Sequence, residues 1–170
     1  MVGVKLGDRL LQIGCGDGGL LAALGSKVGL TGRACGVEPD ANQAVRARAT
    51  AEREGVLVEV VVAPYGMLPY DDESFDVIAV RDVIGALRPY ERVRCLQDAY
   101  RVLRPGGRII VIEAAERGGL GKFLTDRSAD PSYANAGRAS GALRAEGFAP
   151  VRVIAEREGF AFTEGTRPNR

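Results

Sequence analysis

The sequence predicts an α/β fold, an open doubly wound sheet with helices on both of its faces. Short, nearly continuous apolar runs alternate along the chain with longer segments of helical periodicity. Such continuous hydrophobicity is typical of parallel strands that are buried on both faces of a sheet. Near the carboxyl end, two strand-like runs are separated by only a few residues, which is too short for a parallel crossover. These last two strands are therefore predicted to pair antiparallel.

Seven apolar runs are predicted as strands. The first five, expected to be parallel, are residues 10–13, 34–37, 58–62, 75–80 and 108–112. The antiparallel pair is expected at residues 151–155 and 159–163. A length of 170 residues suits one domain with one core, so residues 1–170 are expected to form a single domain.

The segments between these runs carry helix signals. Residues 41–54 follow Asp40, a suitable N-cap, and end before Gly55. Residues 90–103 place apolar side chains on one face, and Pro105 follows shortly after them. Helices are also expected at residues 18–24 and 139–146.

Composition narrows the possible functions. A net charge of +1 gives no general attraction to nucleic acid or to an anionic membrane, so neither is an expected partner. The sequence has no run of 18 apolar residues and no signal-peptide pattern, and we expect a cytoplasmic protein. Three widely spaced cysteines, Cys15, Cys35 and Cys95, predict neither a disulfide framework nor a metal site. The absence of histidine excludes an imidazole base.

A glycine-rich turn is the most informative feature. The first predicted strand runs into Gly14-Cys15-Gly16-Asp17-Gly18 and then into a helical segment. Such a turn lets a ligand approach bare backbone and the positive end of a helix. Glu38 ends the second predicted strand, 20 residues after Gly18, which suits an acid that binds ribose hydroxyls. The pattern predicts an adenosine-containing cofactor; the alternative is a tight turn without ligand and a solvated or capping acid.

Five segments together resemble the class I S-adenosylmethionine-dependent methyltransferases, in particular the small-molecule branch that includes ubiquinone/menaquinone biosynthesis enzymes. They are residues 10–21, 29–40, 68–78, 100–108 and 159–168, in the order that the family has them. The resemblance implies a Rossmann-like sheet of seven strands, with the seventh antiparallel between the fifth and the sixth. It also implies S-adenosylmethionine as cofactor, bound across the carboxyl ends of the first, second and fourth strands, and a small-molecule acceptor.

The resemblance assigns cofactor contacts to individual positions. Gly14, Gly16 and Gly18 would let the methionine and ribose portions reach the backbone, to which Cys15 also contributes. Glu38 would hold the ribose hydroxyls. Pro39 would lie against the adenine face.

Three positions depart from the family pattern. Gln12 stands where an acid often lies near the cofactor's amino group, and its amide oxygen can still accept a hydrogen bond. Pro64 replaces an acid that contacts adenine, so the backbone around Tyr65 and Gly66 would have to reach the adenine edge. Where many relatives carry histidine, this chain has glycine and alanine, Gly85 and Ala86.

Candidate chemistry follows the fourth strand. Arg81 and Asp82 are expected at the crevice, as cofactor or substrate contacts or as an ion pair, and Asp82 is a weak candidate for a general base. Three tyrosines could line an acceptor pocket or serve in packing: Tyr65, Tyr90 and Tyr133. A base is needed only if the acceptor must lose a proton.

Two other functions remain open at this point. One is a catalytically silent methyltransferase-like module, used for cofactor binding or as a scaffold. The other is an NAD(P)-dependent reductase, since Gly14-x-Gly16-x-x-Gly19 matches the dinucleotide fingerprint, although no Tyr-x-x-x-Lys pattern accompanies it. Because only nine residues precede the first predicted strand, we expect the acceptor side to be covered by residues 114–139, by a homodimer or by a partner subunit. The glycines and scattered charges of residues 114–139 predict a mobile loop rather than a core element.

Overall fold

All seven predicted strands lie in one sheet in the computed structural model, which describes residues 2–115 and 130–169. The strands are β1 (Arg9–Ile13), β2 (Arg33–Val37), β3 (Glu59–Val61), β4 (Phe75–Arg81), β5 (Leu103–Ala114), β6 (Val151–Arg157) and β7 (Phe160–Thr166). Their order is β3-β2-β1-β4-β5-β7-β6. β7 runs antiparallel to both of its neighbours, and the first five strands pair in parallel. The predicted topology is confirmed.

The described helices include the four that the sequence predicts. They are α1 (Gly19–Val28), α2 (Ala41–Arg53), α3 (Pro89–Val102), α4 (Pro131–Asn135) and α5 (Arg138–Ala145), with a 3-10 turn η1 (Ile84–Ala86). The N-cap at Asp40 is confirmed, because its Oδ1 accepts hydrogen bonds from the backbone N–H groups of Asn42 (2.7 Å) and Gln43 (3.2 Å). The sequence did not predict α4 or η1.

Several element ends differ from the prediction, including the carboxyl ends of β6 and β7, and two of the differences have identifiable reasons. α1 continues past residue 24 because Gly25 is a packing position: a Cβ there would lie 2.8 Å from Val56 Cγ1. β5 begins before residue 108 because Leu103 already pairs with Phe75, ahead of an irregularity in the ladder. Both differences come from contacts between distant segments, which local patterns do not carry.

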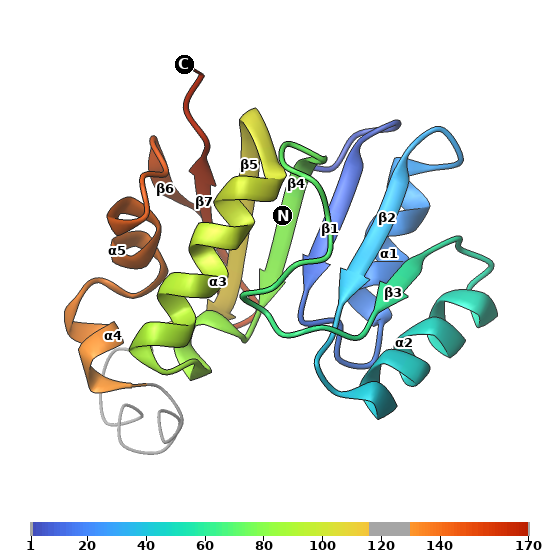
Figure 1. Ribbon diagram of the computed structural model, residues 1–170, viewed down its shortest axis with the longest axis horizontal. Helices are drawn as coiled ribbons and strands as arrows, with labels where there is room; N and C mark the ends of the chain where they lie inside the picture. Colours follow the sequence, from blue (N-terminus) through green and yellow to red (C-terminus); the bar gives the residue numbers. More distant parts are fainter. Residues whose placement is uncertain (1, 116–129, 170) are drawn as a thin grey trace.

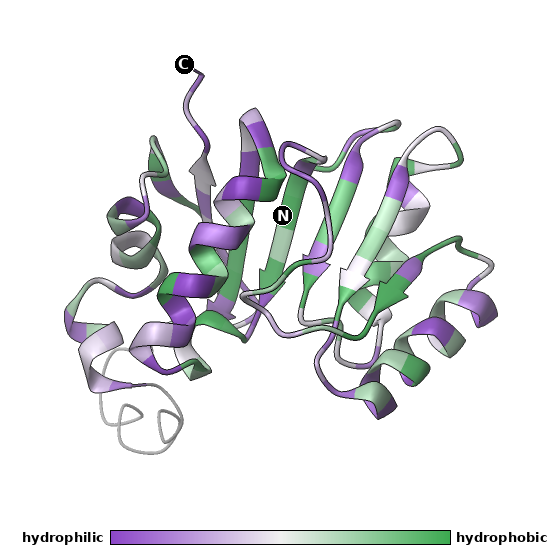
Figure 2. Ribbon diagram, in the orientation of Figure 1, coloured by the Kyte–Doolittle hydropathy of each residue, from purple (hydrophilic) through white to green (hydrophobic). Residues whose placement is uncertain are grey.

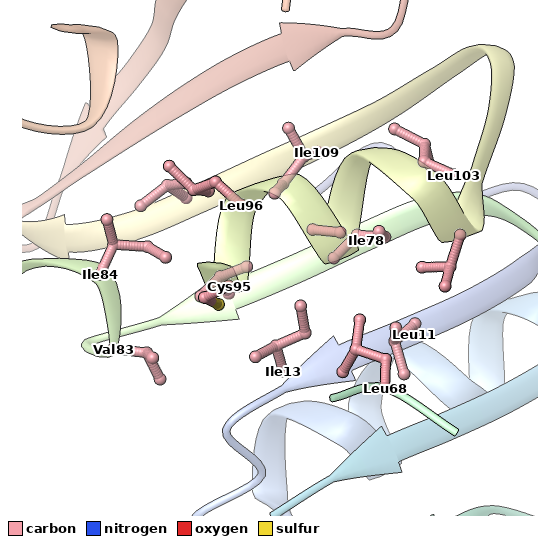
Figure 3. Close-up of a cluster of buried hydrophobic side chains, with 14 of the residues drawn as sticks. Leu11, Ile13, Leu68, Ile78, Val83, Ile84, Cys95, Leu96, Leu103 and Ile109 are labelled. Atoms are coloured by element: carbon pink, nitrogen blue, oxygen red, sulfur yellow. The ribbon is translucent and has the colours of Figure 1, made fainter. Parts of the chain in front are cut away.

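The sheet has a hydrophobic core on each face. α3 lies in front of the sheet and α1 behind it in the view of Figure 1, and apolar residues concentrate along the strands in Figure 2. The core under α3 joins side chains of β1, β4, β5, α3 and η1, among them Ile13, Ile78, Leu96 and Ile109 (Figure 3). The opposite core packs α1 and α2 against the sheet. This burial is the main favourable term that holds the layers together.

The strand order places a switch point at the carboxyl end of β1. From β1 the chain proceeds to β2 and β3 on one side, and then to β4 and β5 on the other side. The arrows of β1, β2, β4 and β5 point to one common edge of the sheet in Figure 1. In open α/β sheets, ligands bind in the crevice at this place. The fold therefore positions the glycine-rich turn and the end of β4 side by side.

Part of the segment that was expected to cover the acceptor side is helical and packed. Residues 116–129, with Gly118, Gly119 and Gly121, lie outside the described residues. The remainder forms α4 and the start of α5, and Tyr133 of α4 is only 1% exposed. The Tyr133 hydroxyl donates to Glu113 Oε2 over 2.6 Å. Within residues 130–139, the expectation of a loop is therefore wrong, because Tyr133 is buried in the core.

None of the helices in the described part of the chain is both long enough and apolar enough to span a membrane.

Candidate functional site

The glycine-rich turn between β1 and α1 has the backbone that its glycines permit. Gly14, Gly16 and Gly18 all have positive φ angles (78°, 53° and 83°). At Gly16, no described atom lies within 4 Å of where a Cβ would stand, so its backbone faces open space. At Gly18, a Cβ would lie 2.5 Å from Ala47 Cα of α2. Gly16 is therefore the position open to a ligand, whereas Gly18 lets α1 and α2 approach.

Glu38 anchors this turn from the end of β2. The residue is 6% exposed, and its Oε2 accepts hydrogen bonds from the backbone N–H groups of Cys15 (3.0 Å) and Gly16 (3.1 Å). Its Oε1 accepts from Asp40 N–H over 3.2 Å. A carboxylate oxygen has room for two hydrogen bonds, so Oε1 keeps capacity for a ligand hydroxyl. The spacing signal found Glu38 but did not reveal that it orders the turn.

Gln12 carries a buried acceptor without a partner. The side chain is at the end of β1 and only 1% exposed, and its Nε2 donates to Gly14 O over 2.8 Å. Its Oε1 atom has no hydrogen-bond partner among the described residues. An unsatisfied buried acceptor is costly, and Gln12 lines the crevice, so a ligand N–H could supply the missing donor.

These groups line a polar chamber of about 420 Å³ at the carboxyl edge of the sheet. Its lining is Gln12, Gly14, Cys15, Gly16, Asp17, Leu20, Glu38, Gln43, Tyr65, Arg81, Asp82 and Val83. Three carboxylates and one guanidinium are among them, which favours a cationic ligand over an anionic one. Eight of these residues were sequence candidates, whereas Asp17, Leu20, Gln43 and Val83 were not assigned a role.

An apolar chamber of about 340 Å³ lies next to the polar one. Its lining is Pro39, Pro64, Tyr65, Gly66, Met67, Leu87, Tyr90, Glu91 and Arg94. The first four of these are the positions that the resemblance placed around adenine. Met67 directly follows Gly66, and the other residues come from the first turns of α3 and the segment before it. Sequence reasoning connected this second group with the crevice only through Tyr90. Two prolines and a tyrosine suit a flat, weakly polar ring.

Arg81 and Asp82 lie at the mouth of the polar chamber. Arg81 Nε lies 3.5 Å from Asp82 Oδ2, and both side chains are about half exposed (45% and 55%). The Arg81 guanidinium also lies over the Phe160 ring at 4.9 Å. Asp82 has a positive φ of 55°, held by its N–H donating to Ile112 O over 2.9 Å. The two side chains thus form an ion pair. Their roles as cofactor or substrate contacts, and the role of Asp82 as a base, stay predictions.

The remaining candidates have structural positions. The Cys15 thiol is buried, and burial together with the Glu38 carboxylate raises its pKa to about 12, so it is not an activated nucleophile. At Gly85, a Cβ would lie 3.0 Å from Tyr133 Cε1, so the Tyr133 ring fills the space beside this turn. The described residues contain no group of three side chains suited to hold a metal ion.

The fold and the crevice together define a class: a Rossmann-like cofactor-binding protein in which β7 is inserted antiparallel. The profile of the methyltransferase domain family matches residues 11–111, and the chain belongs to this family. S-adenosylmethionine is the cofactor that membership of this family indicates.

Curated relatives are methyltransferases of quinone biosynthesis. The chain is 32% identical over 115 residues to the 2-phytyl-1,4-beta-naphthoquinone methyltransferase of Arabidopsis thaliana, covering 65% of this chain and 43% of that protein. It is 34% identical over 113 residues to the ubiquinone/menaquinone biosynthesis C-methyltransferase UbiE of Escherichia fergusonii, covering 65% of this chain and 44% of that protein. The chain thus spans less than half the length of these relatives.

Solved structures share the fold. A SAM-dependent methyltransferase from Aquifex aeolicus superposes with a TM-score of 0.79 at 20% identity, covering 98% of this chain and 85% of that chain. The [4+2]-cyclase SpnF superposes with a TM-score of 0.77 at 20% identity, covering 98% and 77%. Since a cyclase has the same fold, these likenesses establish the architecture but do not by themselves establish the reaction.

Proposed function

We propose that this chain is an S-adenosylmethionine-dependent methyltransferase that acts on a small molecule. The cofactor supplies an electrophilic methyl group on a sulfonium, so the protein's task is to align the acceptor with that group and to exclude water. Membership of the methyltransferase domain family and the match to quinone methyltransferases support this activity.

The main observation behind the proposal is that backbone N–H groups of the glycine-rich turn already donate hydrogen bonds to Glu38. In dinucleotide-binding proteins, the corresponding backbone N–H groups face a pyrophosphate. Here the N–H groups of Cys15 and Gly16 donate to Glu38, and Asp17 adds a further carboxylate to the chamber. A pyrophosphate would meet carboxylates at this place, whereas a sulfonium with an ammonium group would be stabilised by them. This geometry favours the methyl donor over NAD(P).

Different residues would bind different parts of the cofactor. Gln12 Oε1 is available to an ammonium N–H, the free capacity of Glu38 Oε1 suits a ribose hydroxyl, and Gly16 leaves room for the ligand. Pro39 and Pro64 provide apolar surface for the base. We infer that Gly14, Cys15, Tyr65, Gly66 and Arg81 contribute the rest of the lining.

We infer that the acceptor meets the cofactor near Arg81 and Asp82, at the end of β4. The sequence contains no histidine, so a histidine side chain cannot serve as the base. The relatives' names refer to naphthoquinone, ubiquinone and menaquinone. An acceptor that is already nucleophilic, such as an ionised phenol or quinol, would need no base. Asp82, a half-exposed carboxylate at the mouth of the chamber, would otherwise be the candidate to accept a proton.

The setting of the enzyme is also part of this proposal. We infer one domain over residues 1–170. We also infer a cytoplasmic location, with which three unpaired cysteines are in keeping. We also infer that a second copy or a partner subunit covers the acceptor side. A solved complex between the Haloferax volcanii Trm112 methyltransferase activator and a putative methyltransferase is a precedent for a second protein bound to a protein of this fold.

Ligand-dependent stabilisation and methyl transfer test the function. Thermal unfolding is measured with S-adenosylmethionine, S-adenosylhomocysteine, NADH and NADPH; only the first two should raise the melting temperature. Transfer of a radiolabelled methyl group is then measured with a panel of quinols and phenols. Stabilisation by NAD(P)H alone would refute the proposal, and cofactor binding without transfer to any acceptor in the panel would favour a silent module.

A further inference from the structure

Tyr65 stands between the two chambers. Of the described residues, it alone lines both the polar and the apolar chamber. It follows β3 in the chain, but its hydroxyl oxygen lies 3.5 Å from where a Cβ of Gly14 would stand, beyond the end of β1. The phenol ring therefore reaches across the carboxyl edge of the sheet toward the glycine-rich turn, in contact with the core under α3.

The two chambers match the two halves of an adenosyl ligand. The polar chamber holds Gln12, Gly16 and Glu38, which suit an amino acid and a ribose. The apolar chamber holds Pro39 and Pro64, which suit a flat base. Ribose and base are joined by a covalent bond, and Tyr65 borders both chambers, so a ligand that uses both chambers lies against the Tyr65 side chain.

We propose that Tyr65 is a specificity-determining gate: its ring closes the passage between the chambers in the free protein and rotates aside when an adenosyl cofactor binds. This inference rests on the proposed function. The affinity for a ligand that spans both chambers is then reduced by the fraction of molecules in which the ring is closed. A bulky side chain at this position also disfavours ligands that cannot displace it.

The chemistry of Tyr65 fits a movable ring. Burial, followed by the Glu38 carboxylate, raises its pKa to about 12, so the phenol is neutral at physiological pH. The residue is half-buried, and among the described residues no hydrogen bond holds its hydroxyl group. Rotation therefore breaks packing contacts but no ion pair.

Binding of S-adenosylhomocysteine to three variants, measured by isothermal titration calorimetry, tests the gate. Tyr65→Ala removes the ring and should tighten binding about three- to tenfold, because no closed state remains. Tyr65→Phe keeps the ring and should bind no tighter than the wild type. Leu57→Ala truncates an exposed apolar side chain far from the crevice and should bind like the wild type.

A second measurement follows the ring in the unmutated sequence. The chain has five tyrosines, so incorporation of 3-fluorotyrosine gives five fluorine NMR signals, and the Tyr65→Phe spectrum identifies the one from Tyr65. This signal should shift when S-adenosylhomocysteine is added. Because this measurement does not use Tyr65→Ala, it tests the gate even if that variant fails to fold.

The outcomes separate the gate from the function. The gate is wrong if the wild type binds S-adenosylhomocysteine and Tyr65→Ala binds it equally or more weakly. It is also wrong if the fluorine signal of Tyr65 does not shift when the ligand is added. Neither result contradicts the methyltransferase proposal. If neither the wild type nor Tyr65→Ala binds S-adenosylhomocysteine, the proposed function itself is wrong, and the gate falls with it. Binding by Tyr65→Ala alone would support the gate.

Discussion

Replacing Glu38 by alanine should damage both the turn and the cofactor site. The substitution removes the acceptor for three backbone N–H groups, those of Cys15, Gly16 and Asp40. Cys15 is buried, so its N–H remains without a partner, whereas Gly16 and Asp40 are more open to water. One buried donor left unsatisfied costs about 1–3 kcal/mol, and two partly hydrated donors add a smaller amount.

The expected loss of stability is therefore about 2–3 kcal/mol. For a domain of this size it lowers the melting temperature by roughly 4–12 °C. Loss of charge-assisted hydrogen bonds to the ribose should cost a further 2–4 kcal/mol of binding free energy, by order of magnitude. This corresponds to an affinity for S-adenosylmethionine that is weaker by about 30- to 1000-fold.

Calorimetry gives the affinity, and thermal unfolding gives the stability. Glu52→Ala removes an exposed carboxylate of α2 far from the turn and should change neither quantity. Glu38→Gln retains the side-chain volume and one amide oxygen, so it should recover part of the stability but only a small part of the affinity. An unchanged affinity of Glu38→Ala would refute the assignment of Glu38 to the cofactor.

Three further predictions concern packing and ionisation. Gly18→Ala should destabilise the protein by about 2 kcal/mol more than Gly55→Ala, as measured by urea unfolding, because both have positive φ but only Gly18 abuts α2; equal losses would contradict this. For Asp76, burial favours the neutral form, but hydrogen bonds from Arg9 and Arg104 lower its pKa to about 2. Asp76→Asn should therefore be less stable than the wild type at pH 7, and the difference should shrink as the pH falls from about 4 to 2; a pH-independent difference would speak against the ion pairs. The three cysteines are buried with pKa values raised to about 11 or 12, so a thiol reagent at pH 8 should label none of them before unfolding.

The sequence predicted the sheet because the signals for its strands are local. Continuous apolar runs such as residues 75–80, and the short link before Phe160, determine strand direction without knowledge of distant contacts. Helix and strand ends were predicted less well. Gly25 looks like a helix end in the sequence, but it is a point of contact with Val56 in the fold.

The candidate site was predicted only in part, because local patterns and the family resemblance indicate some of its residues and tertiary packing brings in the others. Glycine spacing and the acid at the end of β2 indicated one half of the crevice, and the family resemblance indicated the positions around Pro39 and Pro64. The side chains that α3 contributes, such as Glu91 and Arg94, were missed because only tertiary packing brings them to the crevice. The burial of Tyr133 against Glu113 was missed because their hydrogen bond joins residues 20 positions apart.

A crystal structure of the protein with S-adenosylhomocysteine would test the central claim most directly. We predict the ribose hydroxyls within hydrogen-bond distance of the Glu38 carboxylate, the amino group at Gln12 Oε1, and the adenine ring in the apolar chamber beside Pro39 and Pro64. A ligand bound elsewhere, or a crevice that remains empty at saturating ligand, would contradict the assignment of this edge of the sheet as the cofactor site.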